Sequence, residues 1–430
     1  MNLAKESFYT LMFQVSGFLC ATITGMIVAR ALGPANKGII TIALLCPSLF
    51  FTVFHLSVGL GMIHHMGKRQ HEIKAFVGSA LVLLGGLTFL ALLAFLTTAI
   101  FYRDILYRGV ALKYLLVAGL AIPFNLTLYF FSSILQANME IKGYNLANQL
   151  LYYSNLLFVG VFLLSGHLTT LEAVVAGISG TVVGAIVAVL AVIKITGGIS
   201  FDAELTKRLI TDGGKVQIGV IAAFLYSQAN VFILNYYAQP AEVGFYSVAF
   251  SLANILFFFS LSLEIGLYPK TAHASLEDAV ELVSVATRQI LVITTAAAVA
   301  MAIFSKYIVL IYGGAAFLPS IYPLLLLLPG VIVFTIARIL SPLWVRKGWF
   351  LQLTLIAVGT ALFSLVLNIV LIPKFGAKGA AMATTASYCA TTLIVLLLFR
   401  KYVKKDLTGL LVPSRADISL YWNFIEMLRR

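Results

Sequence analysis

Twelve long apolar segments follow one another along this chain of 430 residues, and they constrain its fold more than any other feature. A helix needs about 20 apolar residues to cross a hydrocarbon core about 30 Å thick. The segments predict an all-α integral membrane protein with twelve transmembrane helices. The predicted spans are residues 8–31, 39–62, 75–101, 113–137, 143–165, 169–195, 214–237, 241–268, 283–311, 319–345, 349–373 and 377–402.

The composition also favours a bilayer. Hydrophobic residues make up 61% of the chain and charged residues only 10%, whereas a soluble domain carries roughly 25% charged residues. The first apolar segment, 8–31, is longer than the core of about 7–15 residues in a signal peptide, so we expect a true span. The three cysteines lie singly in apolar segments, which indicates no disulfide framework.

One set of landmarks occurs twice in the same order, at an offset of 205 or 206 residues. In a membrane protein, two equivalent halves usually enclose a central substrate site. The repeat therefore predicts a transporter with two lobes around a central cavity. The paired landmarks are Pro34-Ala-Asn-Lys-Gly38 with Pro240-Ala-Glu-Val-Gly244, Leu106-Tyr107 with Ile311-Tyr312, Pro123 with Pro329, and Lys142-Gly143-Tyr144 with Lys347-Gly348-Trp349.

The predicted lobes hold six helices each, in residues 1–195 and 214–402. The polar stretch 196–213 between them is the predicted cytoplasmic linker, which we expect to be partly helical. Residues 403–430 form the predicted cytoplasmic tail. Apolar residues recur there at helical spacing, which is typical of an interfacial helix, although a packing tail is the alternative. They are Ile418, Tyr421, Trp422, Ile425 and Leu428.

Lysine and arginine predict the orientation, because cytoplasmic loops carry an excess of these residues. Most of the 29 Lys and Arg residues fall on the inner side if the N-terminus is cytoplasmic. We therefore expect both termini in the cytoplasm. The net charge of +13 then faces anionic lipid headgroups, and no nucleic-acid partner is needed to explain it.

Motifs for nucleotide-driven or hydrolytic chemistry are missing from the sequence. It contains no G-x-x-x-x-G-K-[ST], H-E-x-x-H or G-x-S-x-G, and its histidines and cysteines form no metal-binding pattern. Glycosyl transfer usually requires carboxylates, and the predicted outer side is poor in them. We therefore predict a secondary transporter or facilitator rather than an enzyme, with no cofactor or metal.

Three charged residues lie in or at the ends of predicted spans, where charge is costly and usually functional. Arg30 closes the first span and either lines a lumen or extends to the headgroups. Arg338 is deeper, so we expect a lumenal or paired role. Glu264 either forms a structural ion pair with Arg338 or titrates as a coupling site for H⁺ or Na⁺. Two arginines against one acid favour an anionic substrate.

Neutral polar residues also cluster in two spans. Asn145, Asn148 and Tyr152 lie along one face of the fifth span, and Gln228 and Asn230 lie in the seventh. Amides and tyrosines suit sugar hydroxyls, which need donors and acceptors but no net charge. Hydrogen bonding between helices is the equally good alternative.

Several ordered motifs make the chain similar to bacterial polysaccharide flippases of the multidrug/oligosaccharidyl-lipid/polysaccharide exporter superfamily. The resemblance covers essentially the whole chain. Its motifs are Ala29-Arg30-Ala31-Leu32-Gly33-Pro34, Gly59-Leu60-Gly61, Asn230-Val-Phe-Ile-Leu-Asn, Glu242-Val-Gly244-Phe-Tyr246, Leu267-Tyr268-Pro269 and Asn368-Ile-Val-Leu-Ile-Pro373-Lys-Phe-Gly376-Ala-Lys-Gly379.

The resemblance implies two six-helix lobes and a flippase that moves undecaprenyl-pyrophosphate-linked oligosaccharide to the outer leaflet by alternating access. The twelve spans fit the O-antigen and capsule branch, since the lipid II branch usually has fourteen. Many relatives carry an acid where Asn230 stands, so ion coupling at this position is in doubt. Membrane lipids and other polysaccharide-assembly membrane proteins are the implied partners. The alternatives are a cation-coupled multidrug exporter of the same fold and a membrane glycan polymerase or glycosyltransferase.

Overall fold

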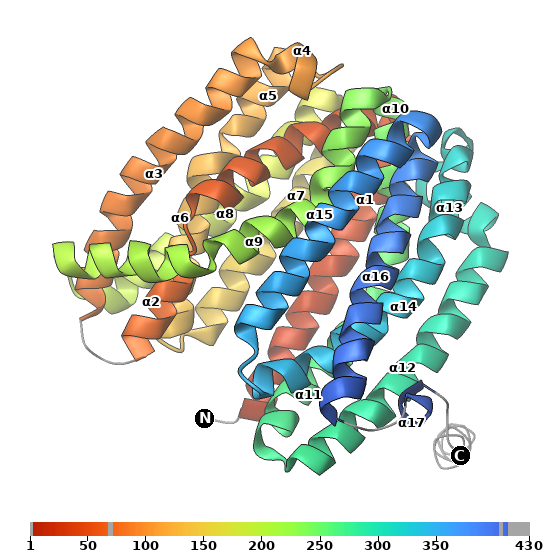
Figure 1. The fold of residues 1–430 in the computed structure, drawn as a ribbon. Coiled ribbons are helices and arrows are strands. Elements are labelled where there is room, and N and C mark those ends of the chain that lie inside the picture. The colour runs from red at the N-terminus through yellow and green to blue at the C-terminus, as the bar shows by residue number, and fades with distance from the viewer. Residues whose placement is uncertain (1–2, 68–71, 404–406, 412–430) are drawn as a thin grey trace, which may run out of the picture. The chain divides into compact units, whose positions relative to one another are not determined.

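The computed structural model describes residues 3–67, 72–403 and 407–411, and no strand occurs among them (Figure 1). The prediction of an all-α membrane protein is confirmed. The helices are α1 (Leu3–Phe54), α2 (Val58–Gly67), α3 (Ile73–Phe101), α4 (Arg103–Leu106), α5 (Leu112–Gly119), α6 (Ala121–Ala137), α7 (Ile141–Leu164), α8 (Thr170–Thr196), α9 (Ala203–Tyr237), α10 (Pro240–Asn254), α11 (Phe257–His273), α12 (Leu276–Ile303), α13 (Ser305–Gly313), the 3₁₀ helix η1 (Ala315–Ser320), α14 (Ile321–Arg346), α15 (Phe350–Phe375), α16 (Ala377–Val403) and α17 (Thr408–Leu411).

The helices of the described residues account for the predicted number of spans. Ten are long and apolar enough to cross a bilayer, and the bent pair α10 and α11 brings the number to eleven. One of the ten, Met12–Phe54, has 43 residues and would be about 65 Å long, about twice the hydrocarbon thickness. Gly33 divides it, with a non-helical φ of 75° and ψ of 177°, and Figure 1 shows α1 as two segments that run in different directions. Counted on either side of Gly33, α1 supplies two spans and the total is twelve.

Four of the predicted spans, 39–62, 113–137, 241–268 and 283–311, are each interrupted by a break in the helix. The breaks lie at residues 55–57, at Leu120, after Asn254 and at Phe304. At Leu120 the reason is local. Pro123 follows in the first turn of α6, where a missing N–H costs nothing because it would have no intrahelical partner.

The break between α1 and α2 is stabilised by a side chain from another helix. Leu56 and Ser57 both have φ of 48°, an uncommon conformation for residues other than glycine. Gln217 of α9 donates from Nε2 to the carbonyls of Thr52 (2.5 Å) and Val53 (3.2 Å) and accepts from Ser57 Oγ (2.7 Å). The carbonyls of Thr52 and Val53, which lie at the end of α1, are therefore hydrogen-bonded by a protein side chain.

The helices repeat in order along the chain. The first part of α1 corresponds to α9, and its second part with α2 corresponds to α10 with α11. Helix α3 corresponds to α12, α4 to α13, and α5 with α6 to η1 with α14. Helices α7 and α8 correspond to α15 and α16. Gly109 (φ 78°) and Gly314 (φ 81°) occupy equivalent turns. The pairing of Lys142-Gly143 with Lys347-Gly348 is wrong, because Gly143 lies inside α7 whereas Gly348 lies in the turn before α15 with φ of 70°.

The chain forms two compact units. The first ends at Phe245 and includes Tyr312–Ala316, and the second contains Tyr246–Ile311 and resumes at Phe317. The core of the second unit includes Leu267, Ile290, Leu340, Trp344 and Phe399. The predicted lobes 1–195 and 214–402, with a linker at 196–213, stay a prediction. The predicted helix over 418–428 lies outside the described residues.

Contacts within the first unit agree with the predicted alternation of the spans across the membrane. Two segments predicted on the inner side lie together, since Ser200 donates its N–H to the carbonyl of Lys74 at 3.1 Å. Two segments predicted on the outer side also lie together, since a Cβ on Gly109 would be 2.8 Å from Pro240 Cγ.

The repeated Pro-x-x-x-Gly motifs contact each other reciprocally. A Cβ on Gly38 would lie 1.8 Å from the carbonyl oxygen of Pro240, and a Cβ on Gly244 would lie 2.1 Å from that of Pro34. Both distances are far below any real van der Waals contact. Each motif therefore needs its glycine because the backbone of the other motif occupies the place of a side chain.

Candidate functional site

An ion pair between two membrane helices is the centre of the candidate site in the second unit. Arg338 of α14 contacts the Oε2 atom of Glu264 of α11 through Nη2 at 2.9 Å and Nε at 3.3 Å. The two side chains keep 24% and 17% of their exposure. The structure therefore forms the ion pair that was one of the two alternatives for Glu264, and neither side chain is fully buried.

A cluster of aromatic rings lies beside the arginine. Its Cζ atom lies 5.3 Å from the centroid of the Phe257 ring, which is within the range of a cation–π contact. Phe334 and Tyr388 stack with centroids 4.4 Å apart, and Phe257 packs edge-on against both. These rings come from α11, α14 and α16, so three helices meet at the arginine's side of the site.

A second polar contact joins the same two helices. The hydroxyl groups of Tyr268 and Ser341 are 2.8 Å apart. Sequence reasoning did not select these residues or the aromatic rings. The signal was present as helical spacing, because Phe257, Glu264 and Tyr268 recur at intervals of seven and four, as do Phe334, Arg338 and Ser341 at four and three.

The polar face of α7 contacts other helices of the first unit. Asn148 donates from Nδ2 to Ser132 Oγ of α6 at 3.2 Å and to the carbonyl of Tyr144 at 2.8 Å. Asn145 is buried, and Tyr152 lies against Gly17 of α1 while remaining 36% exposed. Asn148 thus serves interhelical hydrogen bonding, and contact of these residues with a substrate stays a prediction.

The remaining predicted site residues are dispersed over the first unit. Arg30 is exposed and Gln228 is half-buried. Asn230 is buried, and its Oδ1 atom accepts the N–H of Val231 at 2.8 Å. The structure therefore gives Asn230 a local backbone role, and the lumenal roles of all three residues stay predictions.

The second-unit cluster offers a cation and a carboxylate but no metal site. No group of three or more His, Cys, Asp or Glu side chains that could hold a metal occurs in residues 3–67, 72–403 and 407–411. A guanidinium that shares one carboxylate oxygen can exchange that partner for another anion, since phosphate presents the same type of acceptor. The arrangement suits reversible binding of an anionic group.

Comparison with known proteins gives a family and a fold. The family described as "Polysaccharide biosynthesis protein" matches residues 3–274. The chain is 27% identical over 185 residues to "Probable low-salt glycan biosynthesis flippase Agl15" of Haloferax volcanii. That match covers 41% of this chain and only 38% of the relative.

Two solved structures are similar over almost the whole chain. The lipid II flippase MurJ in an inward closed conformation has a TM-score of 0.80 at 14% identity, covering 94% of this chain and 89% of MurJ. An inward-facing multidrug resistance MATE family transporter of the MOP superfamily has a TM-score of 0.74 at 12% identity, covering 92% and 98%. At such identities these similarities show the fold alone.

Proposed function

The chain belongs to the family of polysaccharide biosynthesis proteins, and from that premise we propose that it is a flippase for lipid-linked oligosaccharides. The proposal rests on one observation: the chain matches a polysaccharide biosynthesis family and is built from membrane-spanning helices. The connections between these helices are short: the longest described stretch without helix covers residues 197–202, and residues 102–111 and 304–314 contain only the short helices α4 and α13. Such a protein is built to move a glycan rather than to synthesise one.

The substrate that we propose is an undecaprenyl-pyrophosphate-linked repeat unit, such as an O-antigen unit of lipopolysaccharide. It moves from the cytoplasmic to the outer leaflet of a bacterial inner membrane by alternating access. Without a protein, the sugar and the pyrophosphate would cross hydrocarbon at a cost of tens of kcal/mol. A polar path through the protein removes much of this cost while the polyprenyl tail stays in lipid.

Arg338 is the residue that we expect to contact the pyrophosphate. The guanidinium presents five donors in a fork that matches phosphate oxygens. Glu264 holds it in place when no substrate is bound. Release of Glu264 on substrate binding would also let that carboxylate take up H⁺ or Na⁺, which is the route that we propose for ion coupling. Other polysaccharide-assembly membrane proteins are the proposed partners.

A deletion strain of the native host tests the function. Lipid-linked glycans are extracted, and completed repeat units are assigned to the cytoplasmic or the outer leaflet. We expect cytoplasmic accumulation and loss of surface polymer, both reversed by the intact gene. Repeat units that reach the outer leaflet without polymerisation would instead indicate a glycan polymerase, and unaffected glycans would remove the flippase proposal.

A cation-coupled multidrug exporter is the second candidate. The MATE transporter of similar fold and the carboxylate of Glu264 within α11 favour it. An exporter would protect a drug-sensitive host, and Glu264→Gln would abolish that protection. A flippase would leave drug susceptibility unchanged while restoring surface polymer to the deletion strain.

A further inference from the structure

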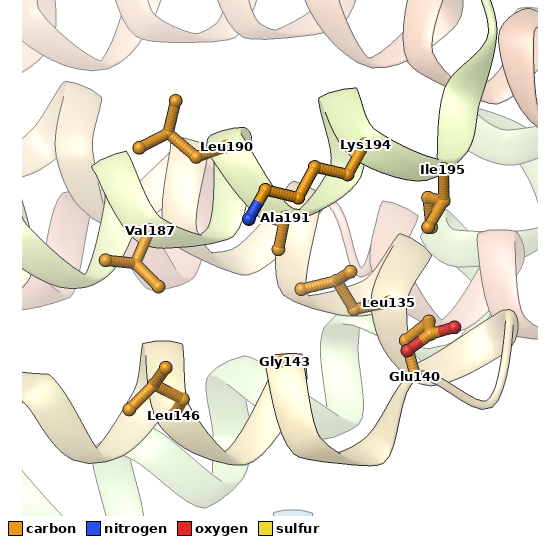
Figure 2. A pocket seen from close by; sticks show the side chains of 9 residues that line it. All are labelled: Leu135, Glu140, Gly143, Leu146, Val187, Leu190, Ala191, Lys194 and Ile195. Atoms are coloured by element: carbon orange, nitrogen blue, oxygen red, sulfur yellow. The ribbon is translucent and has the colours of Figure 1, made fainter.

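An open groove lies at one end of the first unit, where α6 ends, α7 begins and α8 ends. Its volume is about 330 Å³, near the lower limit of roughly 300–1,000 Å³ for pockets that hold small ligands. Most of its lining is aliphatic, and two charged residues complete it (Figure 2). The lining residues are Leu135, Glu140, Gly143, Leu146, Val187, Leu190, Ala191, Lys194 and Ile195.

The groove lies where a membrane surface is expected. Helix α8 has 27 residues and is about 40 Å long, so its ends reach the headgroup region on both sides of a bilayer. Lys194 lies in its last turn, and Glu140 directly precedes α7. Leu146 and Leu190 are 44% and 53% exposed, as expected for side chains that face lipid chains.

The two charges lie on different sides of the groove. Figure 2 shows the Lys194 side chain lying back along α8 with its amine over Ala191, while Glu140 lies across from it at the start of α7. Within the described part of the chain, neither side chain forms an ion pair. A lysine in a last turn is favoured by the helix dipole. The dipole does not account for a carboxylate opposite it with an aliphatic floor between them.

We propose that this groove binds a zwitterionic phospholipid with a primary amine, such as phosphatidylethanolamine. Lys194 would bind the phosphate and Glu140 the ammonium group, both through charge-assisted hydrogen bonds, while an acyl chain lies along Leu146, Val187 and Leu190. A pyrophosphate carries more than one negative charge and would be repelled by Glu140. The charge pattern therefore fits a bulk membrane lipid better than the glycan carrier, and the inference does not depend on the proposed function.

Lipid titration of the purified full chain, followed by native mass spectrometry, tests the proposal. The probes are phosphatidylethanolamine, phosphatidylglycerol and phosphatidylcholine with the same acyl chains. We expect tightest binding of phosphatidylethanolamine, and about a ten-fold loss of its affinity in Lys194→Gln and in Glu140→Gln, equivalent to one charge-assisted contact. Lys207→Gln, an exposed lysine of α9, is the matched control and keeps wild-type affinity.

A further variant fills the groove without changing its charge. A Cβ on Gly143 would lie 3.5 Å from Leu135 Cδ1 and 3.6 Å from Ala191 Cβ, in ordinary contact. Gly143→Leu therefore places a side chain on the floor, and we expect it to lose phosphatidylethanolamine as well. Gel filtration and melting temperature identify any variant that fails to fold.

Several outcomes would overturn the proposal. One is a preference for phosphatidylglycerol that increases in Glu140→Gln, which would make the groove an anionic-lipid site. Another is affinity for phosphatidylethanolamine that none of the three groove variants changes. A third is binding of a polyprenyl phosphate alone, which would assign the groove to the glycan carrier.

Discussion

At the scale of single residues, the ion pair of Glu264 and Arg338 combines two requirements. The pair lowers the cost of placing each charge in the membrane, and neither side chain is fully buried, as the proposed contact with an anionic substrate requires. A structural role and a substrate-binding role are therefore compatible here. If Arg338 binds substrate, translocation still requires it after Glu264 is neutralised. If its role is only structural, translocation does not require it once Glu264 is neutral.

Neutralising one or both partners separates these roles. Arg338→Gln and Glu264→Gln each leave one charge unpaired. Breaking a fully buried pair costs about 3–5 kcal/mol of folding free energy. We expect a smaller loss here, because both side chains keep some exposure. The double variant Arg338→Gln/Glu264→Gln should regain stability but not glycan translocation. Melting temperature and surface polymer are the two readouts. Full recovery of both would assign the pair a purely structural role.

Gly38 and Gly244 are predicted to be intolerant of the smallest side chain. Because a Cβ at Gly38 would lie 1.8 Å from a backbone oxygen, Gly38→Ala must separate two helices, at a cost of about 1–3 kcal/mol or more. Gly85→Ala is the control, since nothing lies within 4 Å of that position in α3. It should be neutral or stabilising by up to about 1 kcal/mol. Equal melting temperatures for the two variants would contradict the close contact.

At the scale of elements, the interrupted helices show where sequence reasoning reached its limit. Hydropathy located the spans because it follows the solvent. It did not locate the break at residues 55–57, where Leu56 and Ser57 take a positive φ. The side chain that bonds to both sides of this break, Gln217, is 160 residues from Ser57 in sequence. Local propensity contains no information about such a distant partner.

Gln217→Leu tests how far the break depends on this side chain. The variant leaves the carbonyls of Thr52 and Val53 and the hydroxyl of Ser57 without their partner, and a buried unsatisfied group costs about 1–3 kcal/mol. We expect a lower melting temperature and faster amide exchange over residues 55–61. Gln352→Ala, at an exposed position of α15, should change neither. Unchanged exchange in Gln217→Leu would mean that the break is maintained by other contacts.

At the scale of the whole molecule, the repeat and the family resemblance were readable from the sequence, whereas the site was readable only in part. Arg338 and Glu264 stood out because charge is rare in apolar segments. The sequence did not reveal which polar residues of α7 contact a neighbouring helix. Asn148 and Tyr152 are equally suited to a sugar by residue type, and only the structure places Ser132 beside Asn148 and Gly17 beside Tyr152. The orientation in the membrane stays a prediction from the distribution of Lys and Arg.

Cysteine labelling tests that orientation. Cys20, Cys46 and Cys389 are first replaced by alanine, and a single cysteine is introduced at Ser165 or Ile199, both of which are exposed connections. A membrane-impermeant maleimide added to intact cells should label Ser165→Cys and not Ile199→Cys. Permeabilised cells should label both. The opposite pattern in intact cells would invert the predicted topology.

The reciprocal glycine contact has a consequence for how this sequence can change over time. Neither Pro-x-x-x-Gly motif can gain a side chain at its glycine unless the other motif moves away, so the two motifs constrain each other. Substitutions at Gly38 and Gly244 should therefore be lost or kept as a pair among descendants. Since backbone meets backbone there, no side-chain rotamer can readjust to make room, so a change at one glycine falls directly on the main chain of the other motif.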